Sequence, residues 1–235
     1  MTEKKQVFRG LDGTGLKYIA MFSMLIDHAG AVLGNFWKFI PGGVRILRMA
    51  GRPAFMIYCF LLAEGFVHTS DRKKYGIRLT LFGLISEVVF DLAVFGRPFY
   101  WGYQNVYFEL ALGLLVLEGI EQSYRLGGAA SVGRLLALAA GCLGAEIIRS
   151  DYGAAGIVIM AGFYYFRNRR TAETIWAAAA GFYESFSYTW GAGALAALPV
   201  FFYNGKRGKR ENKYFFYWFY PAHLLVLFLI RSIIG

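Results

Sequence analysis

Apolar stretches of nearly bilayer length recur along the chain from Leu16 to its end, with short polar segments between them. A helix that crosses the hydrocarbon core of a membrane needs about 20 mostly apolar residues. The pattern therefore predicts an all-α, polytopic membrane helix bundle in which residues 1–235 form a single domain. We expect about nine spans, within a range of about eight to ten, over residues 16–34, 50–68, 76–96, 104–122, 132–149, 151–166, 172–188, 190–204 and 214–234. Gly and Ala are dense between residues 125 and 210, where spans can tilt, break or merge.

The composition agrees with this interpretation, because 57% of the residues are hydrophobic and no long polar stretch remains for a soluble domain. The net charge of +10 comes from basic residues in the loops, where they meet anionic lipid or set the orientation of insertion. We therefore expect membrane lipids and no nucleic acid as partners. Basic residues are more frequent on the side of the N-terminus, which predicts a cytoplasmic N-terminus in a multi-pass protein of the cell (inner or plasma) membrane.

Many titratable residues lie inside or at the ends of the predicted spans. A charge at the centre of a transmembrane helix costs about 2.5 to 3.5 kcal/mol, so such residues usually face the bundle interior or an aqueous cavity. Three pairs are spaced four residues apart and share a helix face: Arg48 and Arg52, Glu64 and His68, and Glu87 and Asp91. The alternative is that these residues form ion pairs between helices that only hold the bundle together. The complete set is Lys17, Asp27, His28, Arg52, Glu64, His68, Arg78, Glu87, Asp91, Glu109, Glu118, Glu146, Glu184 and His223.

His28 is a candidate general base within the first predicted span. It lies about 12 residues into that span, which is about 18 Å from its start and near the middle of the membrane. A neutral imidazole has an ordinary pKa near 6.5 and can accept a proton close to neutral pH. Asp27 points about 100° away around the helix, so its role toward His28 stays open. The alternative for His28 is a buried histidine that another helix satisfies.

Other kinds of site find little support in the sequence. Glu64 and His68 have a spacing that suits metal ligands, and His28, His223 or Asp91 are candidates to complete the set, but no H-E-x-x-H signature occurs. We therefore expect no metal. The Walker pattern, a strand-linked G-x-G-x-x-G and the G-x-S-x-G elbow are also missing from the sequence, which argues against a phosphate loop or a serine hydrolase.

Several stretches resemble the successive motifs of TraX family membrane proteins. They are "LDGTGLKYIAMFSMLIDHAG", "RMAGRPAFMIYCFLLAEGFVHT", "RLTLFGLISEVVFD", "NVYFELALGLL" and "FFYWFYPAHLLVL". The resemblance extends over most of the chain and is weak between about residues 125 and 210. The sequence departs from the family pattern at Met56 and Val89, where a proline is usual, and at Glu109, where a small hydroxyl residue is usual.

The resemblance implies a membrane-bound acetyltransferase, because the conjugative-plasmid member of the family acetylates the amino terminus of a pilin subunit. The donor would be acetyl-CoA. The first span is also similar to that of the wider transmembrane acyltransferases that modify surface sugars, where ten positions separate a basic residue from an essential histidine. Lys17 and His28 fit this spacing. The resemblance thus implies that His28 is catalytic and that Lys17 positions the donor; it also singles out Asp27, Arg52, Glu64, His68, Asp91 and His223.

Acetyl transfer from a thioester needs a base and a donor that stabilises the oxyanion. His28 suits the first task, and Arg52 or His68 the second. Basic residues at the inner mouth suit the phosphates of CoA, namely Arg72, Lys73, Lys74 and Arg78. The alternative for these four is that they only set membrane orientation.

The sequence leaves the acceptor open between a peptide amino terminus, a sugar hydroxyl and a lipid headgroup. Two other functions also remain. One is a proton-coupled transporter that uses the buried Glu, Asp and His groups, and the other is a scaffold in which these groups are structural ion pairs.

Overall fold

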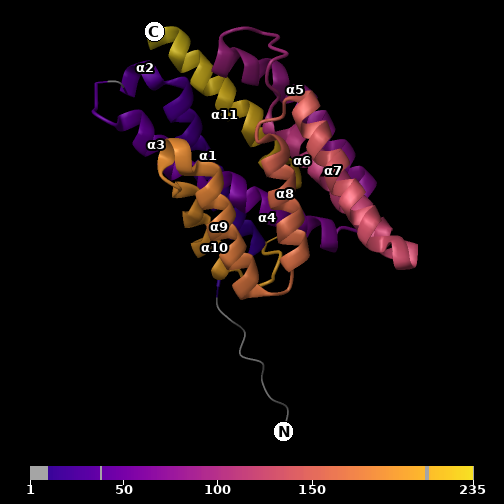
Figure 1. Ribbon diagram of the computed structural model, residues 1–235. Helices are drawn as coiled ribbons and strands as arrows, with labels where there is room; N and C mark the ends of the chain where they lie inside the picture. The colour runs from indigo at the N-terminus through magenta and orange to yellow at the C-terminus, as the bar shows by residue number, and fades with distance from the viewer. Residues whose placement is uncertain (1–9, 38, 210–211, 235) are drawn as a thin grey trace.

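The computed structural model describes residues 10–37, 39–209 and 212–234, which are mostly helical and contain no strand (Figure 1). Two isolated β-bridges join Leu11 to Tyr203 and Gln104 to Ser150. The elements are α1 (Gly13–Val32), α2 (Gly34–Trp37), α3 (Gly43–Gly51), α4 (Pro53–His68), α5 (Arg72–Phe95), α6 (Val106–Ser123), the 3-10 helix η1 (Tyr124–Ala129), α7 (Ala130–Ile148), α8 (Gly153–Phe166), α9 (Arg170–Thr189), the 3-10 helix η2 (Ala192–Ala196), α10 (Ala197–Phe201) and α11 (Lys213–Ile234).

The hydrophobic pattern located most of these helices. Eight of the nine predicted spans each coincide with one long helix, and the ends agree within four residues. The prediction of one continuous span over residues 190–204 is wrong, because η2 and the short α10 occupy it. Gly191 begins this segment with a left-handed φ of 77°. Gly193 then packs on the backbone of α9, where a Cβ would lie 2.6 Å from the carbonyl oxygen of Gly181.

Three helical segments within the described residues are long and apolar enough to cross a membrane. They are Gly43–His68, Gly127–Ile148 and Tyr214–Ile234. The apolar helices Gly153–Phe166 and Ala192–Phe201 are shorter. A count of nine spans and a cytoplasmic N-terminus therefore stay predictions. The prediction of a cytoplasmic N-terminus rests in part on the positive charges of Lys4, Lys5 and Arg9, which lie outside the described residues.

The junction of α3 and α4 packs tightly against α1. The two helices meet at Pro53, which lacks an N–H and is tolerated in the first turn of a helix. The Ser23 hydroxyl of α1 donates to the carbonyl oxygens of Ala50 at 2.7 Å and Gly51 at 3.1 Å. A Cβ at Gly51 would overlap the side chain of Asp27. This close approach brings the end of α3 and the start of α4 against the second half of α1.

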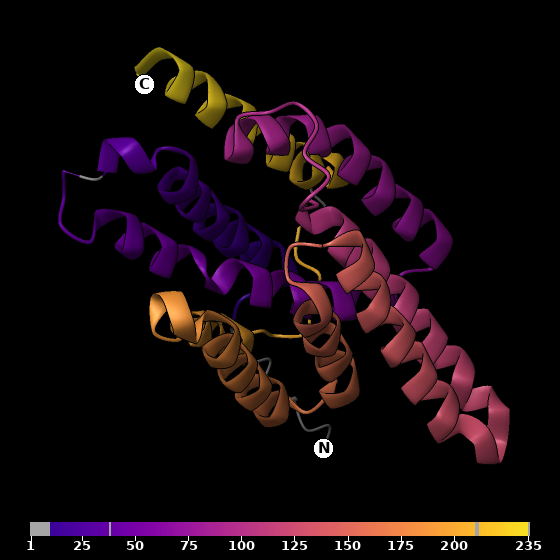
Figure 2. The ribbon, with the colours of Figure 1, turned by 45° about the horizontal axis from the view of Figure 1, so that its top comes forward.

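The remaining helices surround α1 and α4. Helix α11 packs against both α1 and α5, while α8 packs against α4, α6 and α9. Figure 2 shows α6 and α7 side by side as a hairpin that extends beyond the other helices. Within α11, Pro221 cannot donate to the carbonyl of Tyr217, which instead accepts from the Tyr107 hydroxyl at 2.9 Å. This bond ties the middle of α11 to the start of α6.

Candidate functional site

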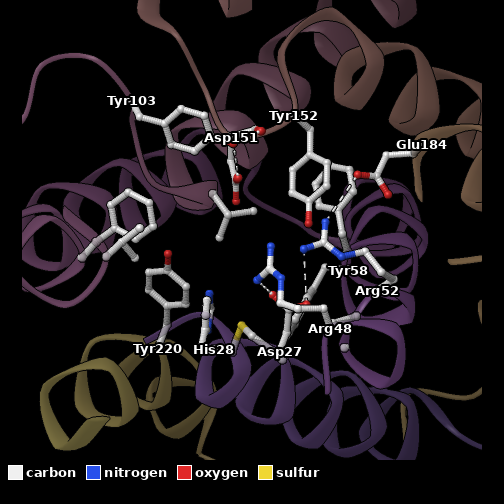
Figure 3. A pocket seen from close by; sticks show the side chains of 18 of the residues that line it. Asp27, His28, Arg48, Arg52, Tyr58, Tyr103, Asp151, Tyr152, Glu184 and Tyr220 are labelled. Carbon is white, nitrogen blue, oxygen red and sulfur yellow. Dashed lines mark hydrogen bonds and ion pairs between the residues drawn. The ribbon is translucent and has the colours of Figure 1, made fainter. Parts of the chain in front are cut away.

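A cavity of about 340 Å³ lies where α1 and α5 end and α4 begins. Its wall is completed by α11, by the ends of α3 and α9 and by the segments before α6 and α8. Figure 3 shows side chains from these separate elements directed into one space. The labelled polar and aromatic lining residues are Asp27, His28, Arg48, Arg52, Tyr58, Tyr103, Asp151, Tyr152, Glu184 and Tyr220.

His28 lines this cavity and is paired with a second histidine. It lies 15 residues after Gly13, about 22 Å along α1 and past the helix midpoint. Its Nδ1 atom is 2.7 Å from Nε2 of His223 on α11, and the two rings stack with centroids 4.9 Å apart. Nδ1 of His223 is in turn 2.7 Å from the carbonyl oxygen of Phe219. The end of the His28 ring that is remote from the α1 backbone points into the cavity (Figure 3).

Asp27 does not orient His28 but holds two guanidinium groups. Its carboxylate forms ion pairs with Arg48, and with Arg52 at 3.3 Å. Nη1 of Arg52 also lies 3.6 Å from Oε1 of Glu184, at the end of α9. The second carboxylate oxygen of Glu184 is buried without a hydrogen-bond partner among the described residues. The network therefore fixes both arginines at the cavity wall, and it leaves one carboxylate oxygen of Glu184 free to accept a hydrogen bond.

The opposite wall is aromatic and carries a carboxylate. The Tyr103 hydroxyl donates to Oδ1 of Asp151 at 2.9 Å and lies 2.6 Å from the carbonyl oxygen of the same residue. Burial raises the pKa of Tyr103, so its hydroxyl stays protonated and remains a donor at neutral pH. Tyr152 stacks on Phe55 with ring centroids 3.4 Å apart. The Tyr220 hydroxyl makes no hydrogen bond within the described residues and faces the cavity (Figure 3).

The structure brings together Asp27, His28, Arg52 and His223 among the residues that the sequence singled out. It places His68 elsewhere, near the end of α4, where the ring is exposed and its Nδ1 lies 2.9 Å from the backbone oxygen of Glu64. Neither residue of that pair lines the cavity.

The acidic pair on α5 is also outside the cavity. Glu87 accepts from the side chain of Asn105, and Asp91 accepts from the backbone N–H of Tyr100 at 2.6 Å. Both acids therefore fix the segment that connects α5 to α6. Glu109, one of the three departures from the family pattern, is fully buried and accepts from the Ser150 hydroxyl.

The predicted donor-binding residues lie at the other end of α1 and at the start of α5. Nζ of Lys17 is 5.2 Å from the centre of the Phe216 ring, at the beginning of α11. The guanidinium of Arg72 lies 3.9 Å from the Phe66 ring centre and pairs with Glu118 at 3.0 Å.

The other three basic residues differ in their surroundings. Nζ of Lys74 pairs with Asp71 at 3.0 Å, whereas the side chain of Lys73 is exposed. The guanidinium of Arg78 lies 5.8 Å from the Tyr75 ring centre. None of the five predicted donor residues lines the described cavity.

Several residues of the cavity have no functional role predicted from the sequence. The sequence did indicate a place for Arg48 beside Arg52, since their four-residue spacing puts both side chains on one helix face. It gave no such indication for Tyr103, Asp151 and Tyr152, because they lie in connecting segments that only the tertiary fold brings to the site. Within the described ranges, no three His, Cys, Asp or Glu side chains are grouped as metal ligands.

Comparison with known proteins identifies relatives over nearly the whole chain. The family model described as "TraX protein" matches residues 12–231. A protein of Dichelobacter nodosus described as "Probable fimbrial assembly protein FimC, serogroup H1" is 30% identical over 238 residues, which cover 90% of this chain and 92% of that protein. No solved structure matches the chain. The chain belongs to the TraX family.

Proposed function

We propose that the protein is an integral membrane acyltransferase that moves an acetyl group from cytoplasmic acetyl-CoA to an amine or hydroxyl acceptor. The observation that carries the proposal is the arrangement around one cavity, where the imidazole of His28 faces two guanidinium groups held by Asp27. Membership of the TraX family supports the same chemistry through the resemblance to pilin acetylation. The spacing of Lys17 and His28 adds the similarity to the wider transmembrane acyltransferases.

In this proposal His28 is the general base. Its Nε2 atom takes the proton of the acceptor as the acceptor atom attacks the thioester carbonyl. Positioned proton transfer of this kind contributes about 10² to 10⁴ in rate. The partial burial of the ring limits access of bulk water to that nitrogen.

Arg48 and Arg52 stabilise the oxyanion that forms on the thioester carbonyl. A guanidinium carries five N–H donors, and Asp27 and Glu184 occupy only some of them. The remaining donors are fixed before the reaction, which makes their interaction with a developing charge effective. His68, the other sequence candidate for this role, lies outside the cavity wall and is a weaker choice.

The donor is proposed to enter from the end of the bundle that holds Lys17. Lys17 and His28 are 11 residues apart on nearly the same face of α1, a separation of about 16 Å. This length suits an extended phosphopantetheine arm between phosphates near Lys17 and a thioester near His28. Arg207 lies close to Lys17, and Lys73 and Arg78 would add positive charge at the phosphate end. Arg72 and Lys74 would contribute less, because each already has an acidic partner.

The proposed topology has about nine spans and a cytoplasmic N-terminus, which would put the Lys17 end inside and the cavity in the outer half of the membrane. An acceptor would then approach from the outer side. The name of the Dichelobacter relative favours a fimbrial subunit among the three acceptor classes. A sugar hydroxyl and a lipid headgroup remain the other acceptors to compare.

The proposal is tested with the full chain in lipid nanodiscs and acetyl-CoA labelled in the acetyl group. Transfer is measured to a panel that contains a peptide with a free amino terminus, a saccharide and an aminolipid. His28→Gln should lower kcat by at least about 10²-fold while acetyl-CoA binding is retained, and His68→Gln should keep the wild-type rate. Undiminished transfer by His28→Gln would rule out the proposed base. Solute flux in liposomes that depends on Glu87 or Asp91, with no binding of acetyl-CoA, would favour the transporter instead.

A further inference from the structure

The hydrogen bonds of His223 determine where its proton lies. Its Nδ1 atom is 2.7 Å from the carbonyl oxygen of Phe219, and a carbonyl oxygen only accepts. Nδ1 of His223 must therefore carry the hydrogen. The ring is 6% exposed and makes no ion pair with an acid among the described residues, which disfavours its doubly protonated form. Nε2 of His223 consequently offers a lone pair.

This lone pair in turn determines the tautomer of His28. Nε2 of His223 is 2.7 Å from Nδ1 of His28, so Nδ1 of His28 must donate. A neutral imidazole has one N–H, and the other nitrogen, Nε2 of His28, is left as the acceptor on the cavity side. The charged groups that face His28 from α3 and α4 are Arg48 and Arg52, and the positive charge of both disfavours an imidazolium before substrate binds.

The neighbouring rings hold both histidines in this arrangement. The Phe219 ring stacks on His223 with centroids 4.9 Å apart. The Tyr220 ring meets both histidines edge-on, at 5.8 Å from His28 and 5.7 Å from His223. Phe219 and His223 are one helical turn apart on α11, so the carbonyl oxygen of Phe219 belongs to the helix backbone. Two hydrogen bonds therefore link this backbone oxygen, through His223, to the ring of His28 at the cavity.

We propose that His223 is a positioning residue that holds His28 in its Nδ1–H tautomer, so that Nε2 of His28 is the atom that exchanges the proton. The inference rests on the proposed acyl transfer. The acceptor atom bonds to the acetyl carbonyl carbon as its proton moves to Nε2 of His28, then the carbon–sulfur bond breaks and the CoA thiolate takes that proton. While His28 is protonated, its Nδ1–H bond to His223 becomes charge-assisted and stronger. A neutral histidine thus occupies the place that a carboxylate holds beside the base in a serine protease.

The tautomer is measured without activity by ¹⁵N NMR of the full chain labelled in histidine. The sequence contains three histidines, so His68→Gln and His223→Gln assign all the ring signals. We expect a protonated Nδ1 and an unprotonated Nε2 for His28 in the wild type. A protonated Nε2 on neutral His28 would overturn the proposal, whether or not the protein is active.

Two substitutions then separate positioning from packing. His223→Gln places an amide oxygen, an acceptor, near the position of Nε2, and it should keep the His28 tautomer and kcat within about threefold. His223→Leu offers no acceptor, so His28 should populate both tautomers and kcat should fall at least about tenfold, with the KM for acetyl-CoA unchanged. Wild-type kcat and an unchanged His28 spectrum in His223→Leu would contradict the inference.

The outcomes also distinguish this inference from the proposed function. If the wild type shows the expected tautomer but transfers no acetyl group to any acceptor, the acyltransferase function fails and the positioning by His223 stands. If His223→Leu does not fold, the wild-type spectrum and the His223→Gln variant still decide the question. His68→Gln serves as the matched control, because that exposed histidine should change neither the spectrum of His28 nor kcat.

Discussion

Oδ1 of Asp27 lies 3.3 Å from Nη2 of Arg52, and this ion pair joins α1 to the start of α4. The same carboxylate binds Arg48 near the end of α3. All three side chains are largely buried, with 14% to 23% of each exposed. Their charges are therefore stabilised mainly by one another and little by solvation. Asp27 therefore fixes the two cations of the proposed oxyanion site, although it is the residue directly before the base in the sequence.

The first prediction concerns the charge of Asp27. Asp27→Asn keeps the shape of the side chain but removes the anion that holds Arg48 and Arg52. We expect kcat to fall by about 10- to 100-fold as the guanidiniums move, and Tm to fall because the two largely buried cations lose the anion that they share, which leaves Arg52 with Glu184 alone. His28→Gln is the comparison, since it removes the base and should leave Tm close to that of the wild type. An Asp27→Asn protein with normal kcat and Tm would show that the network is dispensable.

The second prediction concerns Arg48, which the sequence did not single out as catalytic. Arg48→Gln should lower kcat by about 10²- to 10³-fold if its guanidinium stabilises the oxyanion. Binding of acetyl-CoA, measured by equilibrium dialysis, should change little because the phosphates are proposed to bind at the Lys17 end. A weaker acetyl-CoA affinity with unchanged kcat would instead assign Arg48 to donor binding. Arg125→Gln, at an exposed position of η1, is a surface control that should leave both quantities near the wild-type values.

The third prediction tests the close contact between Gly51 and α1. In Gly51→Ala the added methyl group would overlap Asp27, so α3 must shift and the ion pairs with it. Overpacking of this kind costs about 1 to 3 kcal/mol, and we expect a lower Tm together with a lower kcat. Gly34→Ala is the matched control, because nothing lies within 4 Å of a Cβ there and the change should be neutral or slightly stabilising.

The contrast between α1 and the cavity explains how much the sequence could predict. Helix positions follow from apolar runs of sufficient length, which is why residues 16–34 and 214–234 were located within a few residues of α1 and α11. The length of the apolar run gives a wrong prediction of one continuous helix over residues 190–204, where the backbone packing of Gly193 on α9 overrides the apolar pattern. Run length also missed α3, a nine-residue helix that carries two arginines in its sequence GVRILRMAG.

Only part of the site could be predicted from the sequence, for a similar reason. Spacing within one helix indicated that Arg48 and Arg52 share a face, and the structure confirms it. Spacing could not tell that Asp27 binds these arginines instead of His28, because that depends on how α1 and α3 cross. It also could not assign Asp151, whose carboxylate reaches the cavity wall through a turn between α7 and α8.

The fourth prediction concerns the orientation that the proposed donor route requires. Lys74 and Arg97 stand at the two ends of α5, and both side chains are exposed. After Cys59 and Cys142 are replaced by Ala, a single Lys74→Cys should react with a membrane-impermeant maleimide only when the cytoplasmic face is opened. Arg97→Cys should react in intact cells, because the predicted cytoplasmic N-terminus puts that end of α5 outside. The reverse labelling pattern would put the Lys17 end outside the cell, away from cytoplasmic acetyl-CoA, and the proposed donor route would fail even if the chemistry at His28 were correct.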